Sequence, residues 1–349
     1  MKKELPIAAC LLALGVALCW NVGNPLRSQA SAENSLGQTT AAVLAEGTSD
    51  VTAEPAAGFL NILQAAGGKQ DLWCKSTLVS TGQALNRLPS IATRTQLACR
   101  LYDMELLARG KYFQTENGQK SRLELIFDDS LSPLSILQIC DGQFSYTLRS
   151  GGKQQRLEFV DLGRLENKDA GLSAVALPAS WVMGGGIGAT LIHYAEAFHF
   201  QAIDINDPER LHVRGVWDTR VLANLLYSID DELPQERPTE VEWDNLPEHM
   251  PHGIELTFSK LTGEVMQPET ITLFQFAKGQ GRAIATPMMI IEFDTFEVPN
   301  ALPPALFTIE SNGFEAVEVT DVYNEKIREL SVGLPQVAVA PNDVEQHAR

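Results

Sequence analysis

The residues best suited to bind a metal lie in one acidic stretch of the sequence. His249 and His252 are three positions apart with Glu248 beside them, so two imidazoles and a carboxylate could hold a divalent cation. Pro251 stands between the histidines and prevents a helix from presenting both on one face. The surrounding residues 230–251 are acidic and lack apolar periodicity, which is typical of a solvated loop. The pattern favours a surface segment, and we predict no metal and no cofactor.

A glycine run, Gly184 to Gly188 interrupted by Ile187, precedes a segment with helical periodicity at 189–198. Backbone amides at such a position can cradle a phosphate. The run lacks the Gly-Lys-Ser/Thr ending of a phosphate loop, and a dinucleotide fingerprint would need a parallel βαβ unit. The glycines are better explained as a turn that lets the helix pack close to a sheet.

The sequence contains no motif typical of hydrolases. It lacks both the G-x-S-x-G elbow and the HExxH spacing. Two carboxylate pairs, Asp128-Asp129 and Asp230-Asp231, lie at expected turns, where Asp is favoured by local hydrogen bonding. Glycosidase acids are defined by their separation in space, which a sequence does not contain. We therefore predict no catalytic residues and no enzymatic activity, with an enzyme of unknown class as the weaker alternative.

Composition limits the classes of partner. The 349 residues include 44 Asp and Glu against 27 Lys and Arg, for a formal net charge of -17, and 44% are hydrophobic. Such a chain folds, and its length suits one large domain or two smaller ones. The acidic balance argues against binding nucleic acid, and against an electrostatic grip on anionic lipid headgroups, because both need clustered Lys and Arg.

The N-terminus predicts export. Met1-Lys2-Lys3 is basic, residues 5–20 carry no charge, and Ala30-Ser31-Ala32 offers a cleavage site, so residues 1–32 form a secretory signal. The uncharged run extends to Leu26 and is long enough to cross a bilayer, so an uncleaved anchor that contacts the membrane is the alternative. Either route predicts a protein in the periplasm, or one held at the inner membrane by its N-terminal segment.

Beyond this leader the chain divides into three parts. Residues 33–57 are a flexible linker, residues 58–332 form one patterned domain, and residues 333–349 form a flexible tail. Three cysteines lie in the domain, at Cys74, Cys99 and Cys140, without the CxxC spacing of a zinc or redox motif. A disulfide between Cys74 and Cys99 and a set of buried free thiols are equally good interpretations.

The domain is mainly β in its pattern. From residue 91 onward, apolar and polar residues alternate over long stretches separated by hairpin turns such as Asp141-Gly142, which predicts an antiparallel meander. Short helices are expected at 56–66, 189–198 and 220–229. The expected strands are 94–101, 104–115, 121–127, 135–140, 143–149, 155–161, 200–205, 212–217, 253–260, 269–277, 288–296 and 314–319.

Several of these segments resemble the LolA-like group of bacterial envelope proteins. The resemblance rests on Leu123 to Phe127, on the D-G-x-x-x-Y pattern from Asp141 to Tyr146, and on the later stretches 253–263 and 290–296. It covers about residues 92–319, with an insert near 167–229 that it leaves unexplained.

The resemblance implies an α+β, mainly β fold: a strongly curved antiparallel sheet, or half-barrel, with a few helices covering its concave face. It also implies that the protein binds a lipid or the acyl chain of a lipoprotein in an apolar cavity. The alternative is an envelope structural or protein-interaction module with no small ligand.

Alternation within the strands suggests which residues would line such a cavity. Side chains two positions apart share a face of the sheet, so the large apolar residues of several strands can meet on its concave side. Simple core packing is the competing explanation. The candidate cavity residues are Phe113, Leu123, Leu125, Phe127, Phe144, Tyr146, Phe274 and Phe276.

Overall fold

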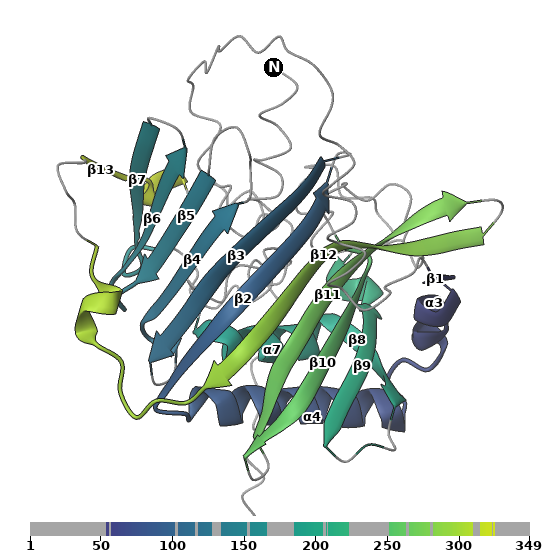
Figure 1. Cartoon of the computed structure of the whole chain (residues 1–349). Helices are drawn as coiled ribbons and strands as arrows, with labels where there is room; N and C mark the ends of the chain where they lie inside the picture. The colour runs from purple at the N-terminus through teal and green to yellow at the C-terminus, as the bar shows by residue number, and fades with distance from the viewer. Residues whose placement is uncertain are drawn as a thin grey trace, which may run out of the picture.

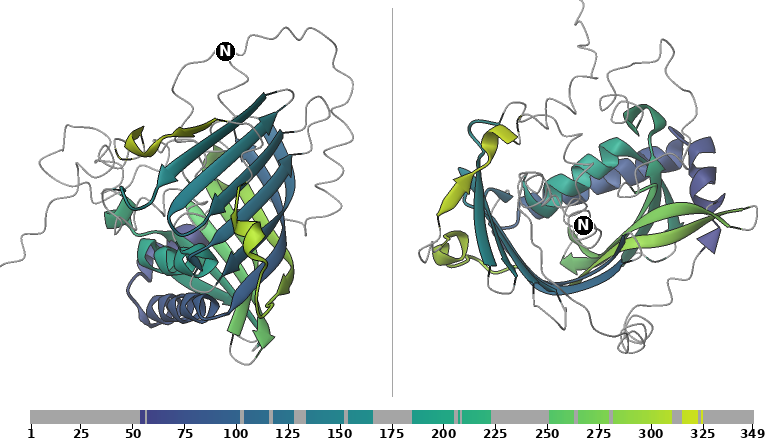
Figure 2. Two further views of the ribbon diagram at one scale, coloured as in Figure 1. Left: turned by 90° about the vertical axis from the view of Figure 1, so that its left-hand side faces the viewer. Right: turned by 90° about the horizontal axis from the view of Figure 1, so that it is seen from above.

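The computed structural model shows a curved antiparallel sheet with helices across its concave side (Figures 1 and 2). The described residues are 54–55, 57–101, 104–115, 118–127, 134–151, 154–165, 185–204, 207, 209–222, 251–262, 265–279, 282–309, 315–322 and 324. The leader, the tail and most of the acidic stretch at 230–251 lie outside these residues.

The first half of the sheet is a meander in which each strand pairs with the next in sequence, as expected. Its strands are β2 (Ser90–Leu101), β3 (Met104–Thr115), β4 (Ser121–Phe127), β5 (Leu134–Cys140), β6 (Phe144–Gly151) and β7 (Gln154–Asp161). The Asp141-Gly142 turn joins β5 to β6. The Asp141 carboxylate accepts hydrogen bonds from the amides of Gln143 and Phe144, and Gly142 has φ 98°, which glycine adopts without strain.

The second half is also a meander, and it joins the first where β12 pairs with β2. Its strands are β8 (Phe198–Asp204), β9 (Arg210–Trp217), β10 (Gly253–Thr262), β11 (Val265–Gly279) and β12 (Arg282–Glu297). Two short strands complete the sheet: β1 (Glu54–Pro55) pairs with β12, and β13 (Ala316–Glu318) runs parallel to β7. Strands β13 and β8 form the two edges, so the sheet is open, as the half-barrel prediction requires.

Two helices, α4 (Lys69–Asn86) and α7 (Gly186–Ala197), lie across the concave side (Figure 2). A Cβ on Gly82 of α4 would lie 2.4 Å from the carbonyl oxygen of Gly188 on α7, so the backbones approach closely at this point. Helix α3 (Ala57–Gln64) packs on the opposite face of the sheet, and η4 (Pro304–Phe307) follows β12. No helix among the described residues is long and apolar enough to span a membrane.

Strand β1 and helices α4 and η4 were not expected. The helix at 189–198 and the strands at 200–205 and 212–217, expected within the range 167–229, are present as α7, β8 and β9, and they belong to the same sheet and helix layer as the rest of the domain. Residues 219–222 are helical, at the start of the helix expected at 220–229, and the rest of that helix lies outside the described residues.

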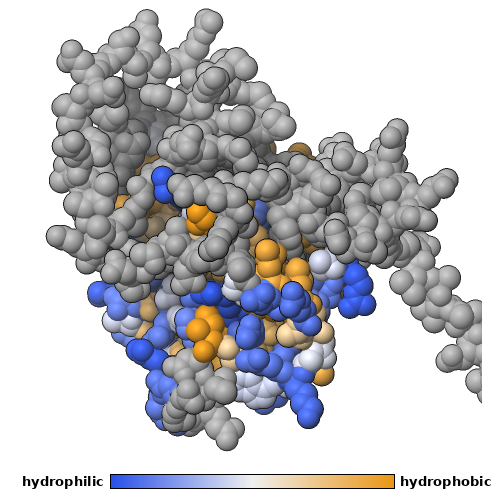
Figure 3. All heavy atoms as spheres, turned by 90° about the vertical axis from the view of Figure 1, so that its right-hand side faces the viewer, coloured by the Kyte–Doolittle hydropathy of each residue, from blue (hydrophilic) through white to orange (hydrophobic). Residues whose placement is uncertain are grey.

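The sheet buries apolar side chains on both faces. The larger cluster lies between the concave face and the two helices, and the smaller one lies under α3. From the side of α3 and β8, hydrophilic residues surround a few apolar ones (Figure 3). Leu72, Trp73 and Ile203 are among the exposed apolar residues of the described chain.

Candidate functional site

Three of the eight predicted cavity residues lie on the concave face. Leu123, Leu125 and Phe127 of β4 are 1–3% exposed and belong to the same core cluster as residues of α4 and α7. Tyr112 of β3 is directly opposite Leu123, and Ile136 of β5 is opposite Leu125, so both point to the same side. We call these five residues the apolar floor.

Two predicted residues on β11 face the other way. Phe274 and Phe276 pack against Phe59 of α3, with ring centroids 5.0 and 5.3 Å apart. Their neighbour Leu273 instead belongs to the concave cluster. The expectation that Phe274 and Phe276 face the concavity is therefore wrong.

The same correction applies to Phe113, Phe144 and Tyr146. Phe113 follows the concave residue Tyr112 along β3, so its side chain lies on the convex face. Phe144 and Tyr146 contact Phe159 there, at 5.8 and 6.0 Å between centroids. Alternation identifies residues that share a face, but it does not identify which face the helices cover.

Helix α7 is attached to the floor through its N-terminus. The Oε1 atom of Gln114 accepts hydrogen bonds from the Tyr112 hydroxyl, at 2.8 Å, and from the Ile187 amide, at 3.2 Å. A Cβ on Gly186 would lie 2.2 Å from the same oxygen. The glycines thus permit close packing on the sheet, which is the structural explanation that the sequence favoured over phosphate binding.

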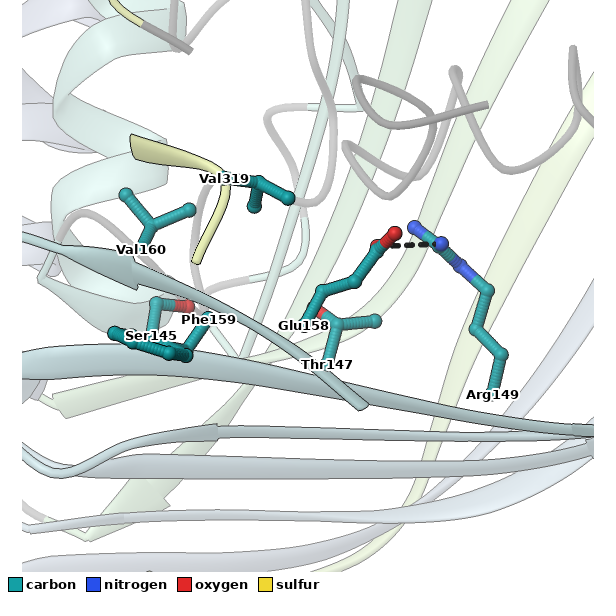
Figure 4. A pocket seen from close by; sticks show the side chains of 7 residues that line it. All are labelled: Ser145, Thr147, Arg149, Glu158, Phe159, Val160 and Val319. Carbon is teal, nitrogen blue, oxygen red and sulfur yellow. Dashed lines mark hydrogen bonds and ion pairs between the residues drawn. The ribbon is translucent and has the colours of Figure 1, made fainter. Parts of the chain in front are cut away.

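Beyond the floor, the concave face becomes polar. Gln138 of β5 lies opposite Leu123, Thr147 of β6 lies opposite Gln138, and Glu158 of β7 lies opposite Thr147, so all four side chains are on the concave face. Here the structure forms a pocket with about 220 Å³ of empty space, part of it open to solvent (Figure 4). Its lining residues are Ser145, Thr147, Arg149, Glu158, Phe159, Val160 and Val319.

Two arginines hold the Glu158 carboxylate in this pocket. Glu158 is 2% exposed, its Oε2 atom lies 2.6 Å from Arg149 Nη1, and its Oε1 atom lies 2.6 Å from Arg156 Nε. We call Ser145, Thr147, Arg149, Arg156 and Glu158 the polar corner. None of the five was predicted, because Phe144 and Tyr146, which alternate with Ser145 and Thr147, were expected to face the concavity. The signal was the run of polar residues at every second position of β6 and β7.

A second charged cluster joins α4 to the edge strand β8. Asp71 of α4 accepts hydrogen bonds from the Phe200 and Gly67 amides, both at 2.8 Å, and its Oδ2 atom lies 2.7 Å from His199 Nδ1. The other imidazole nitrogen lies 3.2 Å from Asp218. Burial raises the pKa of Asp71, but the two amides, His199 and Lys75 outweigh it and hold the pKa below its usual value. These contacts hold α4 against the edge strand β8.

The remaining chemical candidates also have structural roles. His252 is buried, and its Nδ1 atom accepts a hydrogen bond from the Phe276 amide, while His249 lies outside the described residues. In the described part of the chain no three His, Cys, Asp or Glu side chains are placed to hold a metal. Cys74, Cys99 and Cys140 are buried and form no disulfide, so the disulfide interpretation is wrong and the buried-thiol interpretation is confirmed.

Comparison with known proteins finds similar folds at low identity. No family model and no curated protein matches the sequence. Solved structures that match include a LolA superfamily protein from Nitrosomonas europaea (13% identity, TM-score 0.29, 67% of this chain and 97% of that one). LprF from Mycobacterium bovis matches with 14% identity and a TM-score of 0.30, over 68% of this chain and 98% of that one. A DUF1329 family protein from Desulfovibrio piger matches with 8% identity and a TM-score of 0.29, over 68% of this chain and 97% of that one.

Proposed function

We propose that this chain is an exported, non-catalytic protein of the cell envelope that binds the acyl chain of a lipid or lipoprotein on the concave face of its sheet. The position of the apolar floor carries the proposal. Helices α4 and α7 pack most closely against each other and against β8 and β11. The middle strand of the floor, β4, is four strand spacings from β11, or about 19 Å. Large apolar side chains thus continue along the concave face well beyond the strands that these helices pack on most closely.

The floor residues are buried, so binding of an acyl chain to them requires the concave side to open. Each buried CH₂ group contributes about 0.8 kcal/mol, so about fifteen of them contribute about 12 kcal/mol. Association costs of about 4 kcal/mol or more leave about 8 kcal/mol at most, which corresponds to a Kd no tighter than about 1 μM. Opening the concave side weakens binding further, so we expect micromolar or weaker affinity for a single acyl chain.

The test uses tryptophan reporters on the two faces of the sheet. In Phe127→Trp the reporter is on the concave side, and in the matched control Phe144→Trp it is on the convex side. A fatty acid brominated along its chain should quench the first variant saturably, beyond the quenching of the unsubstituted protein, and should leave the second near that background. Equal quenching of both variants would place the ligand elsewhere. An absence of saturable binding would replace the carrier proposal with the interaction module.

A further inference from the structure

The concave face is amphipathic across four neighbouring strands. Leu123, Gln138, Thr147 and Glu158 lie directly opposite one another from β4 to β7. Adjacent strands are about 4.8 Å apart, so the carboxylate strand is about 14 Å from the centre of the apolar floor. A ligand with an apolar chain and a polar end would meet matching surfaces along this line.

The polar corner has an excess of positive charge. Arg149 and Arg156 carry two charges against one on Glu158, and no other charged side chain is described on the concave side of β4 to β7. The Arg149 side chain is 17% exposed and that of Arg156 is 40% exposed, so both are partly accessible to solvent. The whole chain is acidic, so electrostatic attraction of an anionic group is confined to this pocket.

Two buried acceptor oxygens, one in the polar corner and one beside it on β5, have no aligned hydrogen bond in the described part of the chain. Gln138 is 1% exposed, and its Oε1 atom is without a hydrogen-bond partner in the described part of the chain. The Oε1 atom of Glu158 has its ion pair with Arg156 but no aligned hydrogen bond. Buried acceptors without donors cost free energy. A bound group that carries hydroxyl donors would remove that cost.

Resting on the proposed function, we infer that the polar corner binds the oxyanion of the ligand's head group while the acyl chain lies on the apolar floor. Guanidinium groups bind carboxylate and phosphate oxygens through paired, charge-assisted hydrogen bonds. Glu158 holds the two arginines in place and competes with the ligand for them. The ligand is thus an acidic lipid, either a free fatty acid or a phospholipid with a phosphate and hydroxyl groups.

Three probes with the same acyl chain separate the parts of this inference: a fatty acid, a lysophosphatidylglycerol and the neutral monoacylglycerol. Both anionic probes should bind the full chain at least about tenfold more tightly than the neutral one, which corresponds to 1.4 kcal/mol. Tighter binding of lysophosphatidylglycerol than of the fatty acid identifies a phospholipid as the source, and the reverse order identifies a fatty acid. Equal affinity for all three overturns the inference and leaves acyl binding intact, whereas no binding of any probe overturns the proposed function.

Variants locate the preference in the corner. Arg149→Gln and Arg156→Gln should each reduce the preference for anionic probes at least threefold without changing affinity for monoacylglycerol. Arg122→Gln is the matched control, because Arg122 pairs with Glu124 on the convex face and is 18% exposed, close to the value for Arg149. Glu158→Gln should increase affinity for the anionic probes by removing the internal competitor. If this variant stays folded, with unchanged thermal stability, and shows no such increase, Glu158 does not compete with a ligand for the arginines and the inference is wrong.

Discussion

Replacing Asp71 by Asn tests whether a buried charge attaches α4 to the sheet. The carboxylate is 2% exposed and accepts from the Phe200 amide on one oxygen, and from the Gly67 amide and His199 on the other. Asparagine keeps one acceptor oxygen and turns an NH₂ group toward donors at the other position. Hydrogen bonds to a charged group contribute about 1.5–3 kcal/mol each. We expect the free energy of unfolding to fall by about 3 kcal/mol at pH 7, measured by urea denaturation.

The pH dependence of this loss identifies the charge as its cause. The folded pKa of Asp71 lies below the ordinary aspartate value of 3.8, so the stabilisation is present above that value and is lost as the pH falls through the folded pKa. The deficit of the Asn variant should be constant near neutral pH and should shrink below pH 3.8. Asp321→Asn is the control, because that side chain is 87% exposed and its pair with Arg164 is worth less than about 1 kcal/mol. Equal losses in both variants, or a loss at Asp71 that does not change in acid, would refute the reasoning.

Two further predictions concern helix packing and the thiols. Gly82→Ala gains about 1 kcal/mol of helix propensity, but its Cβ would lie 2.4 Å from the Gly188 oxygen, and overpacking costs about 1–3 kcal/mol. The midpoint of thermal unfolding should therefore fall, whereas the exposed control Ser80→Ala should raise it slightly. A rise in both variants would show that α4 and α7 can move apart at Gly82 without loss of stability. Burial raises the pKa of the Cys74 thiol to about 11, so Cys74 should resist alkylation at pH 8 until urea is added, as judged by peptide mass spectrometry. Rapid labelling of the folded chain would contradict its placement in the core.

The strands could be predicted because two local signals agree. The segments 104–115 and 121–127 were expected with the bounds that β3 and β4 have, since alternation is continuous there and turn residues end it. Helix α4 gave no such signal. It buries the polar residues Asp71 and Thr81 and exposes Leu72 and Trp73, so its sequence is only weakly amphipathic. Tertiary contacts to β8 and α7, not local pattern, stabilise it.

The site was predicted only in part, for a similar reason. Alternation correctly grouped Leu123 with Phe127, and Phe144 with Tyr146, but it could not orient β6 relative to β4. The face on which each side chain of β6 lies follows from the register across β5, where Gln138 lies opposite both Leu123 and Thr147. The polar residues of β6 and β7 therefore face the concavity, and this became evident only when the strands were paired.

Native mass spectrometry of the protein purified gently from its own host tests the acyl-binding proposal most directly. The account predicts a species heavier than the polypeptide by the mass of one acidic lipid, lost on organic extraction and identified as that lipid in the extract. Polypeptide that carries no lipid, from material that also fails to bind a fatty acid saturably, would contradict it.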